Sequence, residues 1–290
     1  MGTFLGHIVP GLAFALFGLW HTLNTIRSYK LKGPSNFTSA TWFPFPTIKH
    51  LELYLLLSFS LLAAVLQLLD YPLFALSFKP DNLEHATMFL HVIIYASVAL
   101  AVDFSSSPNT LAGLVGALAA SAFGQELFLL HFHSTDHVGL EGHYHWLLQL
   151  IATASFLASV VATGAPGSFV AAVIRSASVM FQGLWFVVMG FALWVPSLAP
   201  KGCHAVASAA ARQGAVACAT EEASTRAVAL ANLQFSWTLA GVCILTAYLS
   251  LRPGMVKPVE YRQLQPRGFD MCQGSADHPG EGIKQVHVAF

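Results

Sequence analysis

Histidine and carboxylate side chains gather in one stretch of the chain, Gln125–Leu150, which apolar runs flank on both sides. Imidazole and carboxylate groups bind zinc, and imidazole also binds copper and iron. The same groups relay protons when they lie at membrane depth. The stretch therefore indicates a metal site or a proton site, without naming a reaction. Its ionisable residues are Glu126, His131, His133, Asp136, His137, Glu141, His143 and His145.

The composition shows which kind of element must position these side chains. The chain has 290 residues, of which 55% are hydrophobic and only 10% are charged. Soluble domains carry about 25% charged residues. A deficit this large, spread along the whole chain, predicts an integral membrane protein. The formal net charge is zero, so nothing favours nucleic acid as a partner, and membrane lipid is the partner that we expect.

Seven apolar segments are each about as long as a bilayer crossing, which takes about 20 residues. We expect residues 1–252 to form an all-α, polytopic, seven-helix transmembrane domain and residues 253–290 to form a disordered tail. Gly139 and Gly142 argue against one continuous helix through the histidine-rich stretch. Pro196–Arg226 is expected to be an alanine-rich loop with some helix. The predicted spans are Phe4–Ile26, Leu51–Leu69, Glu84–Val102, Thr110–Leu130, His143–Thr163, Val170–Val195 and Ala227–Leu251.

The placement of Lys and Arg predicts the orientation of the spans. Most of these residues fall on the side that holds the first loop and the C-terminal tail. The positive-inside rule then places the N-terminus outside and the C-terminus in the cytoplasm. Cys203 and Cys218 would share an oxidising outer loop, where they form either a disulfide or two free thiols. The glycosylation sequon at Asn36 would face the cytoplasm and stay unmodified.

This topology brings ionisable residues from four spans to the outer membrane face. A carboxylate inside a span costs about 2.5–3.5 kcal/mol, so Glu126 should face the bundle and have a partner. Gln149, one helical turn from His145, and Gln182 could support the site from a second layer. A Glu–His hydrogen bond that only packs two helices is the simpler alternative. The candidate metal ligands are His7, His85, His91, Glu126, His133 and His145.

Several motifs, in order along residues 2–250, resemble the transmembrane protein 45 family, and the chain looks like a plant-type member. The resemblance implies seven spans and residence in membranes of the secretory pathway or in the plasma membrane, with undefined biochemistry. It carries over the six candidate ligands by position. The motifs are Gly6-His7, Pro10-Gly11 and Gly18-Leu19-Trp20, then His85 and His91, Glu126 before a His-containing run, His145 before Leu147-Leu148, and Gln182-Gly183-x-Trp185 with Gly190 and Pro196.

Several function classes are compatible with this pattern, and the pattern does not decide whether the protein is an enzyme. The first is a metalloprotein with zinc or another transition metal, which could hydrolyse lipid at the outer leaflet. The second is a structural or trafficking protein in which the polar cluster only packs helices. The third is a metal or proton transporter. A haem carrier that pairs His21 and His50 with His91 and His145 is the least favoured, and no protein partner is indicated.

Overall fold

The computed structural model describes residues 3–69, 80–132, 139–206 and 215–253, which form one compact unit. Within these residues, seven helices are long and apolar enough to cross a membrane. The prediction of an all-α, seven-helix membrane protein is therefore confirmed. The helices are α1 Phe4–Lys32, α2 Leu51–Leu69, α3 Pro80–Asp103, α4 Ala112–Phe132, α5 Gly139–Gly164, α6 Phe169–Trp194 and α7 Glu221–Leu251. The tail predicted for residues 253–290 falls almost wholly outside the described residues.

Local signals explain where the helices begin and end. α2 has its predicted ends, whereas α1 continues past Ile26 until Gly33, whose φ of +74° favours glycine and stops the helix. α7 begins six residues earlier than predicted, because the Thr220 side chain accepts a hydrogen bond from the Ala223 amide and caps the first turn. As expected, the histidine-rich stretch is not one continuous helix: α4 ends at Phe132 and α5 begins at Gly139, whose φ is +67°, whereas Gly142 lies inside α5.

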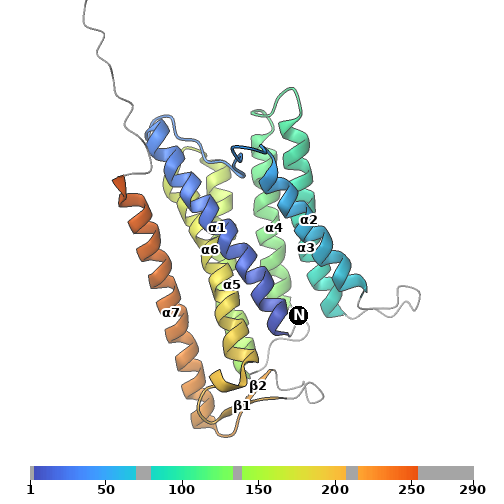
Figure 1. Cartoon of the computed structure of the whole chain (residues 1–290), viewed down its shortest axis with the longest axis vertical. Helices are drawn as coiled ribbons and strands as arrows, with labels where there is room; N and C mark the ends of the chain where they lie inside the picture. Colours follow the sequence, from blue (N-terminus) through green and yellow to red (C-terminus); the bar gives the residue numbers. More distant parts are fainter. Residues whose placement is uncertain (1–2, 70–79, 133–138, 207–214, 254–290) are drawn as a thin grey trace, which may run out of the picture. The chain divides into compact units, whose positions relative to one another are not determined.

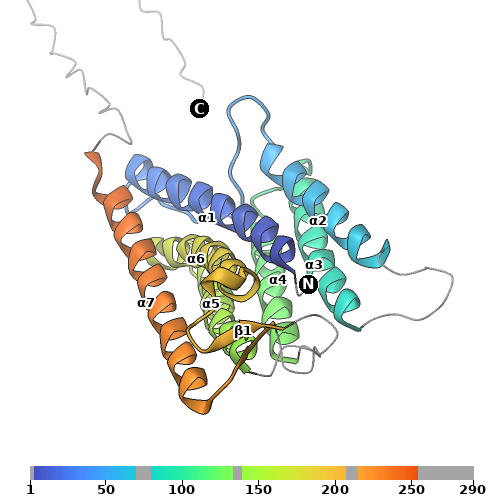
Figure 2. The ribbon, with the colours of Figure 1, turned by 60° about the horizontal axis from the view of Figure 1, so that its bottom comes forward.

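The segment between α6 and α7, expected to be a loop with some helix, contains a short hairpin that was not predicted. A 3₁₀ turn, η1 (Pro196–Leu198), follows α6, and β1 (Cys203–Ala205) then pairs antiparallel with β2 (Val216–Cys218). Cys203 lies opposite Cys218 and forms a disulfide with it. The Ala215 amide donates to Oε2 of Glu141 at 2.6 Å, which ties the hairpin to the first turn of α5. Figure 2 shows the hairpin over that end of the bundle.

The helices pack as two groups that meet along α4 and α5. α1 lies along α6, α5 packs between α6 and α4, and α2 packs on α3 (Figure 1). In Figures 1 and 2, α7 runs along one edge of the bundle and α2 and α3 run along the other. The larger core gathers around the fully buried side chains of Tyr144, Leu148, Trp185 and Met189.

Glycines allow α1 and α6 to approach closely. A Cβ added to Gly18 would lie 2.1 Å from the Met180 nitrogen, and one added to Gly183 would lie 2.1 Å from the Ala15 nitrogen. His7 and His21 of α1 are also buried. In lipid the hydrophobic effect does not drive helices together. Close van der Waals packing at small residues, as between α1 and α6, is therefore one of the forces that hold them together.

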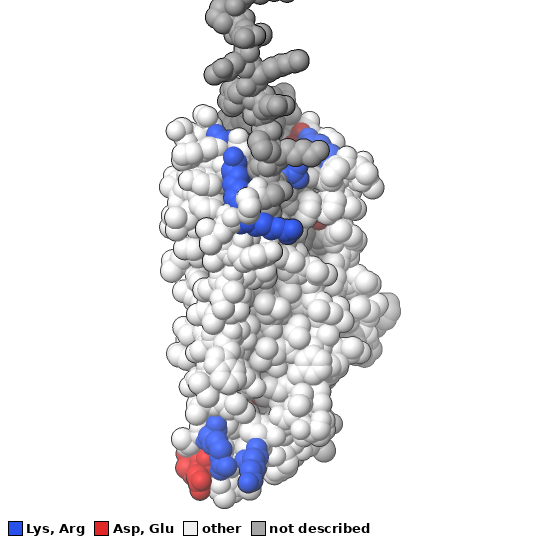
Figure 3. All heavy atoms as spheres, turned by 60° about the vertical axis from the view of Figure 1, so that its left-hand side comes forward, with Lys and Arg blue, Asp and Glu red and all other residues white. Residues whose placement is uncertain are grey.

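The charge distribution fits a bilayer. On the face drawn in Figure 3, the charged side chains of the described residues gather at the two ends of the helices, with an almost uncharged belt between them. At one end, Glu221, Glu222 and Arg226 belong to the first turns of α7. At the other end, Lys30 and Lys32 belong to the last turn of α1.

Candidate functional site

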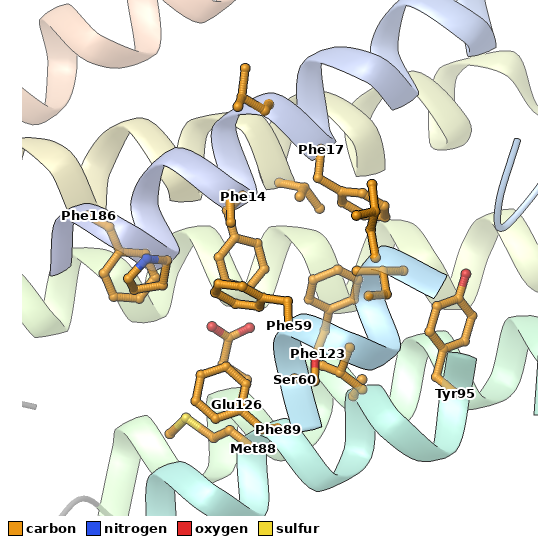
Figure 4. Close-up of a pocket in the computed structure, with 18 of the residues that line it drawn as sticks. Phe14, Phe17, Phe59, Ser60, Met88, Phe89, Tyr95, Phe123, Glu126 and Phe186 are labelled. Atoms are coloured by element: carbon orange, nitrogen blue, oxygen red, sulfur yellow. The ribbon is translucent and has the colours of Figure 1, made fainter. Parts of the chain in front are cut away.

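A cavity of about 710 Å³ lies within the helix bundle and is lined by residues from α1 to α6. This volume falls in the usual range for small-molecule sites, which are mostly apolar with a few placed polar groups. Aromatic side chains form much of the wall, as Figure 4 shows. They are Phe14 and Phe17 of α1, Phe59 of α2, Phe89 of α3, Phe123 of α4 and Phe186 of α6.

Exposed residues of α1 and α2 in the cavity wall indicate that the cavity opens sideways, between these two helices. Three leucines line the cavity and are also exposed on the surface of the bundle: Leu16 of α1 is 67% exposed, and Leu55 and Leu62 of α2 are 56% and 59% exposed. α1 packs on α6 and α2 packs on α3, so neither helix closes the gap between them. In a bilayer this mouth would face lipid acyl chains rather than water.

Five polar residues line the cavity near the disulfide-linked hairpin, and we call them the hairpin-side cluster: His7, His85, Glu126, Glu141 and His145. The ring centroids of His7 and His145 are 5.9 Å apart. Each of these two rings holds Nδ1 at hydrogen-bond distance from a carbonyl oxygen of its own helix, 3.0 Å from Thr3 and 2.9 Å from Glu141. These contacts fix the direction in which both rings point.

Glu126 of α4 is one of the two carboxylates of this cluster. Figure 4 shows its carboxylate pointing into the cavity, toward the rings of Phe14 and Phe59. Its Oε1 accepts a hydrogen bond from Nε2 of Gln182, a fully buried residue of α6. Gln182 therefore orients the carboxylate from the helix behind it.

A second polar group, the loop-side cluster, closes the opposite end of the cavity: Trp20, His21, Glu52, Tyr95 and Arg175. Glu52 is 3% exposed and accepts three hydrogen bonds, from Trp20 Nε1 at 2.8 Å, His21 Nε2 at 2.8 Å and the Phe43 amide at 2.9 Å. The carboxylate thus fixes both α1 and the loop between α1 and α2.

That loop covers the end of the cavity because three helices hold its backbone and one of its rings. The Tyr95 hydroxyl donates to the Thr41 carbonyl at 2.5 Å, and Arg175 Nη2 donates to the Ala40 carbonyl at 2.5 Å. Phe45 stacks on Trp20 with ring centroids 4.2 Å apart. The sequence analysis missed the loop-side cluster. The signal that could have revealed it is that Glu52 and Arg175 are charged residues inside apolar segments, which are site candidates by default.

The structure brings together only some of the predicted ligands. His7, His85, Glu126 and His145 line one cavity, whereas His91 is not part of its wall and holds Nδ1 3.0 Å from the Thr87 carbonyl. His133 lies outside the described residues. In the part of the chain that the structure describes, no group of three or more His, Cys, Asp or Glu side chains is arranged to hold a metal ion.

The remaining candidates have other neighbours. Gln149 lies beside α4, where its Nε2 donates to the Leu130 carbonyl and its Oε1 is 3.3 Å from Nδ1 of His131. The two histidines considered for an inner haem contact carboxylates, His21 with Glu52 and His50 with Asp103. His50 Nε2 lies 2.6 Å from Asp103, which Lys49 also contacts.

A protein-family model matches the second part of the chain, residues 112–251. The matching model is described as a family of unknown function (DUF716) and assigns no chemistry. The matched residues begin where α4 begins and end where α7 ends. They include Glu126, Glu141, His145 and Gln182, but not the α1 to α3 wall of the cavity. Residues 112–251 of this multi-pass membrane protein therefore match a family of unknown function.

Proposed function

We propose that this protein binds a lipid-derived, mostly apolar molecule inside the bilayer. The observation that carries the proposal is the cavity of about 710 Å³ with its mouth between α1 and α2. A molecule that already lies among acyl chains can enter by this mouth without crossing water. The polar clusters at the two ends of the cavity would then select which lipid-derived molecule stays.

The walls support this proposal better than they support an ion path. Between the two polar clusters the cavity wall is mainly apolar, with several phenylalanine rings and only a few hydroxyl side chains such as Ser60, so it offers few ligands to an ion or a proton. The loop-side cluster ties the α1–α2 loop down through Glu52, Tyr95 and Arg175. A closed end and a lateral mouth suit a binding pocket for a membrane-dissolved molecule.

Filling the cavity should prevent binding. Ala122 of α4 lines the cavity, and we expect Ala122→Phe to abolish labelling of the cavity wall by a photoactivatable long-chain lipid. Ala117→Phe adds the same ring to the same helix at an exposed position outside the cavity wall, and it should leave labelling unchanged. Peptide mass spectrometry of the crosslinked protein measures both. Equal labelling of the two variants would contradict the proposal.

A transition-metal site in the hairpin-side cluster is the second candidate. The favouring observation is that His7 and His145 are neighbours and each presents Nδ1 to a backbone carbonyl, as metal-binding histidines usually do. Zinc would need a third ligand, for which His85 and Glu126 line the same cavity. Elemental analysis tests this: metal present in wild type and lost in His145→Ala supports the site, and metal-free wild type purified without chelator contradicts it.

We further propose that the hairpin end of the bundle is exoplasmic and that the protein resides in the secretory pathway or the plasma membrane. Two features support this: a disulfide persists in oxidising compartments, and Lys30, Lys32 and Lys49 belong to the opposite end. The motifs noted in the sequence and the family match together support membership of the transmembrane protein 45 family.

This topology predicts the behaviour of the two cysteines in sealed membranes. A membrane-impermeant reductant followed by an impermeant thiol reagent should label Cys203 and Cys218 in intact cells, whereas the thiol reagent alone should not. The disulfide explains the second result and the exoplasmic location explains the first. Labelling that appears as soon as the plasma membrane alone is made permeable would place the hairpin in the cytoplasm instead, whereas labelling that also needs the internal membranes to be opened would place it in the lumen of the secretory pathway.

A further inference from the structure

We infer that the molecule held in the cavity is an amphipathic amine, whose ammonium group pairs with Glu126 while its apolar chain lies along the phenylalanine wall. This inference rests on the proposed function and names the class of molecule that the same cavity would select. Three observations support it: the hydrogen bonds of the three carboxylates that line the cavity, the aromatic rings near Glu126, and the few other polar groups of the cavity wall.

Among the described residues, three carboxylates line the cavity, and Glu126 is the one with an oxygen available to a ligand. Glu52 is already bonded by three donors. Glu141 accepts from the Ala215 amide of the hairpin. Glu126 accepts from Gln182 at Oε1, and within the described residues its Oε2 has no hydrogen bond. Figure 4 shows the carboxylate pointing into the cavity.

The surroundings of Glu126 favour a cation. In Figure 4 the carboxylate points toward the rings of Phe14 and Phe59, and these two residues line the cavity together with Phe89, Phe123 and Phe186. The face of an aromatic ring attracts an ammonium group, and sites for organic cations commonly combine several rings with a carboxylate. A lone carboxylate in an apolar space is costly, and an ammonium partner offsets that cost in a way that a neutral hydroxyl group does not.

A fatty acid fits this end of the cavity less well. Its carboxylate would place like charge beside Glu126, and the one arginine of the cavity wall, Arg175, belongs to the loop-side cluster and already bonds the Ala40 carbonyl. Ser60 adds a polar contact further along the wall. It is 2% exposed and lines the cavity, and its hydroxyl has no hydrogen-bond partner within the described residues. A hydroxyl or amide group on the same ligand could use it.

The test compares three photoactivatable probes with the same alkyl chain: a primary amine, an alcohol and a carboxylic acid. The full-length protein is reconstituted in lipid nanodiscs, and labelled peptides from the cavity wall are quantified. The variants are Glu126→Gln, Ala122→Phe and Glu222→Gln. Glu126→Gln keeps an oxygen that can accept from Gln182, so the fold is retained. Glu222→Gln removes one charge from an exposed side chain of α7 and controls for net charge.

We expect wild type to be half-labelled at an amine concentration at least about tenfold below that of the alcohol. Glu126→Gln should weaken labelling by the amine about 10- to 100-fold, the range of a charged hydrogen bond, and leave the alcohol unchanged. Glu222→Gln should behave as wild type. Equal labelling by amine and alcohol, a preference that survives in Glu126→Gln, or a preference for the acid would overturn the inference.

The same experiment separates this inference from the proposed function. If Ala122→Phe blocks all probes but Glu126→Gln changes none of them, the cavity binds lipid-derived molecules and the amine selectivity is wrong. If no probe labels the cavity wall of wild type, or if Ala122→Phe does not reduce labelling, the proposed function itself is wrong.

Discussion

Gly183→Ala should separate α1 from α6 and destabilise the folded domain, although it adds only one methyl group. The new Cβ would lie 2.1 Å from the Ala15 nitrogen and 2.5 Å from the Gly11 oxygen. Both atoms belong to the backbone of α1, so no side chain can rotate away and the helices themselves must move. Overpacking a core typically costs about 1–3 kcal/mol, and a backbone clash should cost at least the upper part of that range.

Thermal unfolding in detergent, followed by loss of monodisperse protein, measures this effect. Gly113→Ala and Gly241→Ala are matched controls, because a Cβ at either helical position meets no atom within 4 Å. Alanine favours helix over glycine by about 1 kcal/mol, so both controls should unfold at or above the wild-type temperature. If Gly183→Ala unfolded at the same temperature as the controls, the close packing of α1 on α6 would be wrong.

Glu52→Leu should destabilise the domain by about 3–5 kcal/mol, the range for removal of one partner from a buried charged network. Three buried donors, on Trp20, His21 and the Phe43 backbone, would lose their acceptor. The loop that closes the cavity would also lose its link to α2. Limited proteolysis should therefore cut between Gly33 and His50 in the variant and not in wild type, in addition to the lower unfolding temperature.

Glu52→Gln distinguishes lost hydrogen bonds from lost charge. Trp20 and Phe43 both donate to Oε2, and a glutamine oxygen placed there accepts from both. The amide nitrogen would then face His21, which accepts at Nε2 if it carries its proton on Nδ1. We expect Glu52→Gln to lose less than half of what Glu52→Leu loses. Glu222→Leu, at a side chain that is 90% exposed, is the control and should cause no measurable change.

The transmembrane helices were predictable because each depends only on a local apolar run. α2 follows its run residue for residue, from Leu51 to Leu69. Errors arose where a short-range contact outside the run decides the boundary. The Thr220 cap extends α7 toward its N-terminus, and the pairing of Cys203 with Cys218 makes a hairpin in a segment whose alanines favour helix. Neither contact is visible in hydropathy.

The polar clusters were only partly predictable, because span order fixes the height of a residue in the membrane but not the direction of its side chain. The predicted depth in the membrane was the reason to expect His7, His85, His91 and Glu126 close together. The structure turns His91 away from the cavity and turns Glu126 into it. Glu52 was not predicted as a site residue, since the loop that supplies the Phe43 amide returns to it only in three dimensions.

The pairing of α1 with α6 also constrains the order of events during biosynthesis. α1 leaves the ribosome first, whereas α6 follows four other spans. Until α6 inserts, Gly11 and Gly18 of α1 lack the α6 atoms that cover them in the folded domain, so this part of α1 must be shielded by lipid or by the insertion machinery. A chain truncated after α5 should therefore be retained and degraded, even though each of its five helices is apolar enough to insert on its own.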